Sequence, residues 1–207
     1  MTTQDDMKLA ELLCARLCHD LAGPVGAASA GAELMEEGGD PETARLVALS
    51  AGWAAARLKF FRAALGPGGN PQAAAALHDL ALSYLKTANS GPNTDITLAW
   101  SCGSASLDAD RSRLLLNLIL LARDALVRGG RIEVSVAGAP AVGCLGLSVG
   151  ALGPAVTLGD EAKDVLTAGG DPDGPRGALA WFARRLAERL GGGLRVEALS
   201  GGLKFEI

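Results

Sequence analysis

Two long helical patterns fill the first 65 residues of this 207-residue chain, and they restrict how the remainder can fold. The first runs from about Gln4 to Glu37 and ends at the Gly38-Gly39 pair, because glycine commonly terminates a helix. The second begins at Asp40-Pro41, since aspartate suits the N-cap and proline the first helical position, and it continues to about Leu65. Such a hairpin has more apolar surface than it can bury alone. We therefore expect the rest of the chain to cover it, or two copies to pair into a four-helix bundle.

His19 lies within the first helical pattern, nearly opposite its apolar stripe. At about 100° of rotation per residue, the large apolar side chains fall on one side of the helix and the imidazole on the other. The ring is therefore expected to be exposed rather than packed. The stripe consists of Leu13, Leu17, Leu21, Val25, Ala28, Ala32 and Met35. The neighbours of His19 at helical spacing have very small side chains, which leave room for a partner: Ala15, Ala22, Gly23, Gly26 and Ala30.

The sequence around His19 resembles the phospho-accepting box of two-component histidine kinases. In that box a histidine and an acidic residue are followed, five positions after the histidine, by a helix-kinking proline; here these are His19, Asp20 and Pro24. The chemistry suits the residue, because a neutral imidazole is nucleophilic near pH 7 and forms a phosphoramidate that an aspartate can later take over. Asp20 is placed to orient the ring and to stabilise positive charge on it. A surface histidine without a role remains the alternative at this point.

Composition and charge exclude several classes of protein. The chain is 49% hydrophobic and 20% charged, with a net charge of −4, which is consistent with one large or two small domains. The mild acidity argues against a nucleic-acid partner, which would call for a basic face. No apolar run approaches the roughly 18 residues of a membrane helix, and the polar start gives no sign of a secretory signal. We expect a cytoplasmic protein that binds neither nucleic acid nor membrane.

The cysteines do not form a disulfide framework, because their spacings are scattered. They are Cys14, Cys18, Cys102 and Cys144. The first two lie one helical turn apart beside His19, but the set lacks the complementary ligand pair of a zinc site. We therefore expect buried, reduced thiols and no metal.

The segment at residues 66–71 is dense in glycine and proline and marks a domain boundary, so that residues 1–66 and 71–207 form separate domains. Beyond it, periodicity predicts helices near residues 71–89, 111–127, 160–167 and 178–190. Strands are predicted near residues 95–101, 132–137, 144–149, 194–199 and 203–207. Helices alternating with antiparallel strand pairs indicate a two-layer α/β sandwich, and an α+β class overall.

His78-Asp79 repeats the His-Asp pair inside the helix predicted over residues 71–89. No proline follows at the matching distance. This histidine is therefore expected to be partly buried or to cap the helix.

The order of elements after residue 71 resembles the ATP-binding domain of the same kinases, but three nucleotide-binding boxes are altered. Asn117 is kept, whereas Leu121 stands where the kinases carry the asparagine that helps to hold magnesium, and leucine cannot ligate a hard cation. Ala151 stands where an aspartate reads adenine. Residues 174–178 lack the paired glycines that let backbone N–H groups approach phosphates. The scaffold is expected to survive without cofactor-binding residues.

A kept accepting box with lost ATP boxes resembles the ChpT-type histidine phosphotransferases of alphaproteobacterial cell-cycle phosphorelays. The resemblance spans nearly the whole chain and is strongest at residues 19–25, 31–34, 114–118 and 128–130. It implies a homodimer in which residues 1–66 provide dimerisation and phosphotransfer, with a degenerate ATPase-like domain at residues 71–207. The implied partners are the receiver domain of a hybrid histidine kinase and response regulators.

The resemblance implies that His19 takes a phosphoryl group from a receiver aspartate and passes it to another, with Asp20 as the second catalytic residue. The receiver would bring the magnesium ion that neutralises the transferring charge, so this chain needs no cofactor of its own. Helical geometry predicts receiver docking at Arg16, Ala22, Gly23 and Gly26. Two alternatives stay open: an active ATP-dependent histidine kinase, and a non-enzymatic adaptor that binds response regulators.

Overall fold

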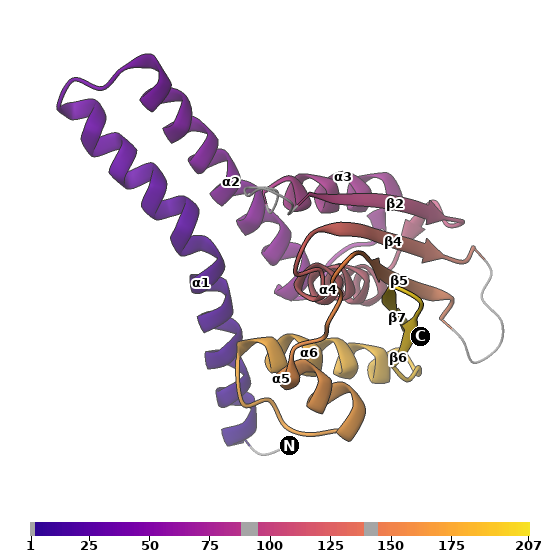
Figure 1. Cartoon of the computed structure of the whole chain (residues 1–207). Coiled ribbons are helices and arrows are strands. Elements are labelled where there is room, and N and C mark those ends of the chain that lie inside the picture. Colours follow the sequence, from indigo (N-terminus) through magenta and orange to yellow (C-terminus); the bar gives the residue numbers. More distant parts are fainter. Residues whose placement is uncertain (1–2, 88–94, 139–144) are drawn as a thin grey trace.

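The computed structural model describes residues 3–87, 95–138 and 145–207, and its N-terminal part is the helical hairpin expected from the sequence (Figure 1). Helix α1 spans Thr3–Glu36 and α2 spans Pro41–Leu65. Asp40 caps α2, because its side chain accepts a hydrogen bond of 2.8 Å from the backbone N–H of Thr43. The predicted helix limits are confirmed to within one residue.

A five-stranded sheet forms the centre of the second part, with the strand order β2-β4-β5-β7-β6. The strands are β2 (Ile96–Cys102), β4 (Gly130–Val136), β5 (Leu147–Leu152), β6 (Arg195–Leu199) and β7 (Gly202–Glu206). The predicted antiparallel strand pairs are confirmed, as β4 with β5 and β6 with β7. Strands β2 and β4 run parallel, because α4 (Ala109–Ala125) forms the crossover between them. The remaining pairs of the sheet are antiparallel. The start of the strand predicted over 144–149 and the end of the helix predicted over 71–89 lie outside the described residues.

Two short strands and three further helices complete the described part of this domain. Strands β1 (Gln72–Ala73) and β3 (Ser106–Leu107) pair antiparallel, and neither was predicted. Helix α3 spans Ala74–Lys86, α5 spans Asp160–Lys163 with a π-turn at Asp164–Ala168, and α6 spans Pro175–Arg189. The described sequence thus forms an α+β protein, as predicted, and its helical layer packs on a mixed sheet.

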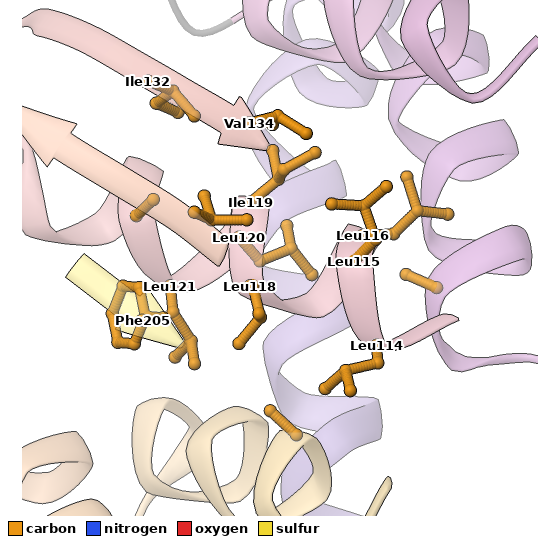
Figure 2. Packing of buried hydrophobic residues seen from close by; sticks show 14 of the residues in the cluster. Leu114, Leu115, Leu116, Leu118, Ile119, Leu120, Leu121, Ile132, Val134 and Phe205 are labelled. Atoms are coloured by element: carbon orange, nitrogen blue, oxygen red, sulfur yellow. The ribbon is translucent and has the colours of Figure 1, made fainter. Parts of the chain in front are cut away.

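Helix α4 is the centre of the core. Every residue from Leu114 to Ala122 is buried. Figure 2 shows the leucine and isoleucine side chains of this stretch gathered with Ile132, Val134 and Phe205 of the sheet. In β4, buried side chains alternate with the exposed Arg131 and Ser135, so one sheet face packs on helices while the other meets solvent.

The C-terminal end of α2 belongs to this same core. Phe60 and Phe61 of α2 are fully buried, and Phe60 stacks on Tyr84 of α3 with ring centroids 4.3 Å apart. The buried Asn117 of α4 donates a hydrogen bond of 2.8 Å to the carbonyl of Ala64. These contacts fix the hairpin to the sheet domain. The boundary at residues 66–71, where the described chain is neither helix nor strand, stays a prediction.

The sheet domain covers only part of the hairpin. Leu13 and Leu17, expected in the apolar stripe of a bundle, pack instead against the core of this same chain. Toward the other end of the hairpin large apolar side chains stay exposed: Val25, Leu34, Met35, Leu46 and Leu49. Leu58, nearer the sheet domain, is exposed as well. Among the described residues, no helix has both the length and the apolarity required to cross a membrane.

Three of the four cysteines lie in the described residues, and all three are free thiols. The expectation of buried thiols was wrong for Cys14 and Cys18, which are exposed, because their face of α1 is not covered by the sheet domain. Cys102 is half-buried, and Cys144 lies outside the described residues.

Candidate functional site

His19 projects from α1 with its side chain 85% exposed. The small neighbours Ala15, Ala22, Gly23 and Gly26 are exposed as well. A Cβ atom added at either glycine would meet nothing within 4 Å. The predicted exposure of the imidazole within a strip of small side chains is confirmed, and the strip leaves the ring open to another molecule.

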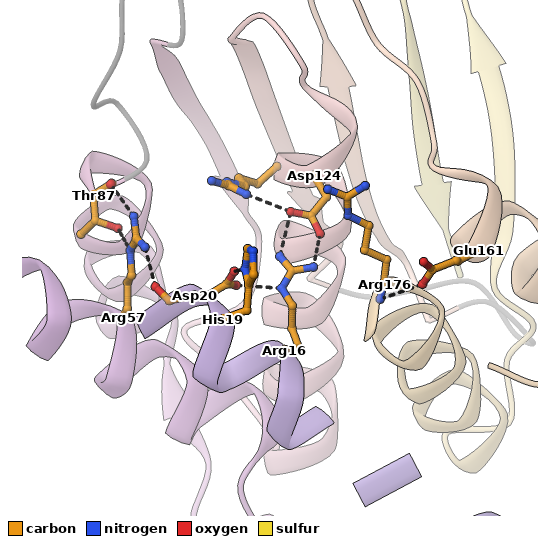
Figure 3. Close-up of polar contacts among 9 residues, drawn as sticks. Arg16, His19, Asp20, Arg57, Thr87, Asp124, Glu161 and Arg176 are labelled. Atoms are coloured by element: carbon orange, nitrogen blue, oxygen red, sulfur yellow. Dashed lines mark hydrogen bonds and ion pairs between the residues drawn. The ribbon is translucent and has the colours of Figure 1, made fainter. Parts of the chain in front are cut away.

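Asp20 contacts the imidazole directly. Its Oδ1 lies 3.1 Å from Nδ1 of His19 (Figure 3). An ionised carboxylate only accepts hydrogen bonds, so this contact favours the tautomer that carries its proton on Nδ1. That tautomer leaves the nucleophilic lone pair on Nε2.

Arg16 joins Asp20 to the sheet domain. Its Nε donates a 2.8 Å hydrogen bond to Oδ2 of Asp20, and its Nη1 and Nη2 donate to the two oxygens of Asp124 at 2.6 and 2.9 Å. Asp124 lies at the end of α4 and also accepts a hydrogen bond of 3.0 Å from Nη1 of Arg123. A continuous series of contacts therefore leads from His19 on α1 to α4.

Arg16 is placed differently from an exposed docking residue, because only 5% of its surface is exposed and its two carboxylate partners belong to this chain. Its role in receiver docking stays a prediction. Nothing in the sequence pointed to Asp124, which lies 108 residues away from Arg16.

The charges in this series support one another. Burial lowers the pKa of Arg16, but the hydrogen bonds and charges of Asp124 and Asp20 outweigh burial and hold that pKa above its ordinary value. Burial raises the pKa of Asp124, yet Arg16 and then Arg123 hold it below 3.8. Both groups are thus ionised at neutral pH, and their hydrogen bonds are charge-assisted.

Pro24 shapes the turn of α1 that carries His19. Proline has no N–H, so the carbonyl of Asp20, four residues earlier, lacks its helical donor. Nη1 of Arg57 on α2 donates to that carbonyl instead, at 2.6 Å. Thr87 anchors the same guanidinium, through its hydroxyl at 3.0 Å and its carbonyl at 2.8 Å. The effect of Pro24 on the helix was expected from the sequence, but the hydrogen bond from Arg57 of α2 that replaces the missing donor was not.

A cavity of about 360 Å³ lies beside His19, between α1, the end of α4 and the start of α6. Glu161 and Arg176 form its far side. Oε2 of Glu161 accepts hydrogen bonds of 3.2 Å from the backbone N–H groups of Arg176 and Gly177. The N-terminus of α6, where backbone N–H groups would otherwise favour an anion, thus already holds a carboxylate of this chain.

The altered nucleotide boxes lie inside the fold. Leu121 and Ala151 are buried members of the core cluster. A Cβ atom at Gly174 would collide with the Glu161 carboxylate, so this glycine makes room for the cap of α6. Glu161 was not identified from the sequence, because its role depends on a contact with a later helix.

His78 is half-buried, as predicted. Its Nδ1 lies 3.0 Å from Oδ1 of Asp79, and its ring packs edge-on against Trp100 at 5.4 Å between centroids.

Comparisons with known proteins give three findings. Residues 84–200 match the family model described as the histidine phosphotransferase C-terminal domain. Protein phosphotransferase ChpT of Brucella abortus (strain 2308) is 36% identical over 140 residues, which are 66% of this chain and 64% of that relative. The chain thus matches slightly less than two thirds of the curated relative. A 1.7 Å structure of a bacterial phosphotransferase superposes with a TM-score of 0.78 and 26% identity, over 99% of this chain and 96% of the other.

Proposed function

This chain belongs to the family of the histidine phosphotransferase C-terminal domain, and from that premise we propose that it relays phosphoryl groups between receiver-domain aspartates through phospho-His19. The observation that carries the proposal is the exposed imidazole whose Nδ1 is held by Asp20. The resemblance to the accepting box of histidine kinases and the similarity to a ChpT protein support it.

The reaction follows from this geometry. Nε2 of His19 attacks the phosphorus of an aspartyl phosphate, an N–P bond forms, and the carboxylate leaves with the electron pair of the broken P–O bond. The phosphorylated ring keeps its proton on Nδ1 and carries positive charge, which the Asp20 carboxylate stabilises. Attack by the aspartate of a second receiver reverses these steps and regenerates the neutral ring.

Magnesium is proposed to come with the receiver, where it neutralises the charge of the transferring group. Within residues 3–87, 95–138 and 145–207, no three His, Cys, Asp or Glu side chains are grouped as metal ligands. Asp20 is engaged by Arg16 and His19, which leaves the positioning of the ring as the contribution of this chain.

We propose that transfer does not depend on ATP. The burial of Leu121 and Ala151 and the placement of Glu161 at the start of α6 support this view over an active kinase. The adaptor alternative makes a different prediction, because an adaptor binds receivers without phosphate ever reaching His19.

The proposed assembly is a homodimer that pairs the free ends of two hairpins. Exposed Leu46 and Leu49 of α2 and Val25 of α1 support it, since exposed apolar surface of this kind marks an interaction site. The proposed partners are the receiver domains of hybrid kinases and response regulators, in a pathway of cell-cycle regulation. We also propose a cytoplasmic location for this chain.

Transfer of label from a phosphorylated receiver tests the function. We expect wild type to acquire label that survives alkali and is lost in acid, because phosphoramidates have that stability. His19→Ala should acquire none, whereas the matched control His78→Ala should be labelled normally. Label on His19→Ala would contradict the mechanism, and receiver binding without label on wild type would favour the adaptor.

A further inference from the structure

The contacts behind His19 cross from the hairpin to the sheet domain, and they end on a carboxylate that no motif identifies (Figure 3). We infer that Asp124 is a positioning residue for phosphoryl transfer, which acts through Arg16 and Asp20 on the His19 ring. This inference rests on the proposed function and adds a residue of the sheet domain to it.

The first argument is geometric. Asp124 accepts two hydrogen bonds from Arg16, at 2.6 and 2.9 Å, and this bidentate pairing fixes the plane of the guanidinium. The Nε–H of the same plane then points at Oδ2 of Asp20, 2.8 Å away. With one carboxylate oxygen held there, Oδ1 faces Nδ1 of His19 at 3.1 Å. Each group thus orients the next, and the series starts at Asp124.

The second argument is the balance of charge. Asp20 must offer negative charge to the ring when phosphorylation makes the ring positive. Arg16 competes for that charge, because its guanidinium lies at the other oxygen of Asp20. Asp124 offsets the charge of Arg16 on its far side, which leaves more of the Asp20 charge for the imidazole. The side chains of Arg16, Asp20 and Asp124 are all largely buried, so solvent screens these interactions weakly.

The third argument is a comparison within the chain. The His78–Asp79 contact has almost the same length as the His19–Asp20 contact. Asp79 is nevertheless exposed, and among the described residues no arginine or lysine pairs with it. A His–Asp contact alone therefore does not require an arginine behind it, and the arginine–carboxylate series is particular to the exposed histidine.

The isosteric change Asp124→Asn tests the inference, because it removes the charge and keeps the shape. We expect kcat for transfer from a phosphorylated receiver to fall roughly tenfold, a part of the hundredfold or more that a positioned acid or base contributes, with KM little changed. We also expect the ¹⁵N chemical shifts of the His19 ring to move toward a mixture of tautomers. The chain has two histidines, so His78 serves as the internal reference.

Control variants separate positioning from other effects. Asp124→Glu keeps the charge and should restore a large part of kcat, whereas Asp79→Asn should change neither the rate nor the His19 spectrum. If Asp124→Asn does not fold, Arg16→Lys serves instead, because lysine keeps a cation but cannot bridge both carboxylates in one plane. It should lower kcat and shift the His19 tautomer in the same way.

The inference is overturned if Asp124→Asn, or Arg16→Lys in its place, leaves kcat and the His19 spectrum unchanged. It is also overturned if KM rises while kcat is constant, since that result would make the series a docking surface. The proposed function fails separately, when His19→Ala still accepts phosphate. The NMR measurement needs no receiver and tests the positioning of the ring even in that case.

Discussion

The two His–Asp pairs of this chain have the same local geometry and opposite surroundings. In both, Nδ1 of the histidine lies about 3 Å from Oδ1 of the next residue, at 3.1 Å for His19 and 3.0 Å for His78. The His19 side chain is 85% exposed and that of Asp20 only 13%, whereas the corresponding values are 35% for His78 and 78% for Asp79. In the first pair, an exposed imidazole thus lies against a largely buried carboxylate. In the second pair, a half-buried imidazole lies against an exposed carboxylate.

This difference shows that the dipeptide alone does not make a reactive histidine. A buried carboxylate keeps one orientation when a partner holds it, and Arg16 holds Asp20 in this way. A solvated carboxylate rotates and is screened, so Asp79 cannot stabilise positive charge on a neighbouring ring to the same extent. The predictions below test this contrast.

Asp20→Asn should have the largest effect on phosphoryl transfer. The amide keeps the shape of the carboxylate but cannot balance positive charge on the ring, so we expect kcat to fall roughly a hundredfold. Single-turnover transfer from a phosphorylated receiver measures this rate. Asp79→Asn is the matched control and should transfer at the wild-type rate. Equal losses in the two variants would show that the two His–Asp pairs do not differ in their contribution to transfer.

The next prediction concerns the small side chains around His19. Ala22→Arg places a long side chain on the exposed strip, and we expect KM for the phosphorylated receiver to rise about tenfold, a loss of about 1.4 kcal/mol of binding. Ala75→Arg, three residues from His78 on an exposed position, is the control. Exchange of phosphate by Ala22→Arg at the normal KM would show that the receiver approaches from elsewhere.

Periodicity and capping predicted the helices of this fold well, because each long helix carries its own apolar stripe and end signals. Strands β1 and β3 were missed, since two residues are too few to show alternation. The direction of β2 relative to β4 was also missed, because strand pairing depends on the crossover and not on either strand.

Prediction of the site from the sequence was limited in the same way, because contacts between distant segments leave no local pattern. Exposure of His19 followed from a single helix, and it was predicted correctly. The burial of Arg16 and the roles of Asp124 and Arg57 depend on which helix packs against α1, and a helical projection cannot supply that information. Contacts between residues 37 and 108 positions apart leave no local pattern in one sequence.

Arg57→Ala should destabilise the turn that carries His19. It removes the donor to the Asp20 carbonyl that Pro24 leaves without a helical partner, and a hydrogen bond from a charged group contributes about 1.5–3 kcal/mol. Urea unfolding measures the loss. Pro24→Ala restores an N–H for this carbonyl, so Arg57→Ala should cost less in that background. An equal cost in both backgrounds would show that Arg57 acts only through Thr87.

The smallest effect concerns acid stability and tests whether Asp124 is held ionised. Burial raises its pKa, but Arg16 and Arg123 outweigh burial and hold it below 3.8 in the folded protein. A group with a lowered folded pKa stabilises the fold above its unfolded pKa of about 3.9, and this contribution is lost as the pH falls through the folded pKa. The difference in unfolding free energy between wild type and Asp124→Asn should therefore be constant from about pH 7 to 5 and shrink below about pH 4.

In Arg16→Met, burial of Asp124 is opposed by Arg123 alone, so the acid-dependent loss should weaken or reverse. Parallel curves for wild type and Asp124→Asn down to about pH 3 would show that Arg16 does not hold this carboxylate charged. The charged contacts of Arg16 with Asp124 would then not explain why the His19–Asp20 pair differs from the His78–Asp79 pair.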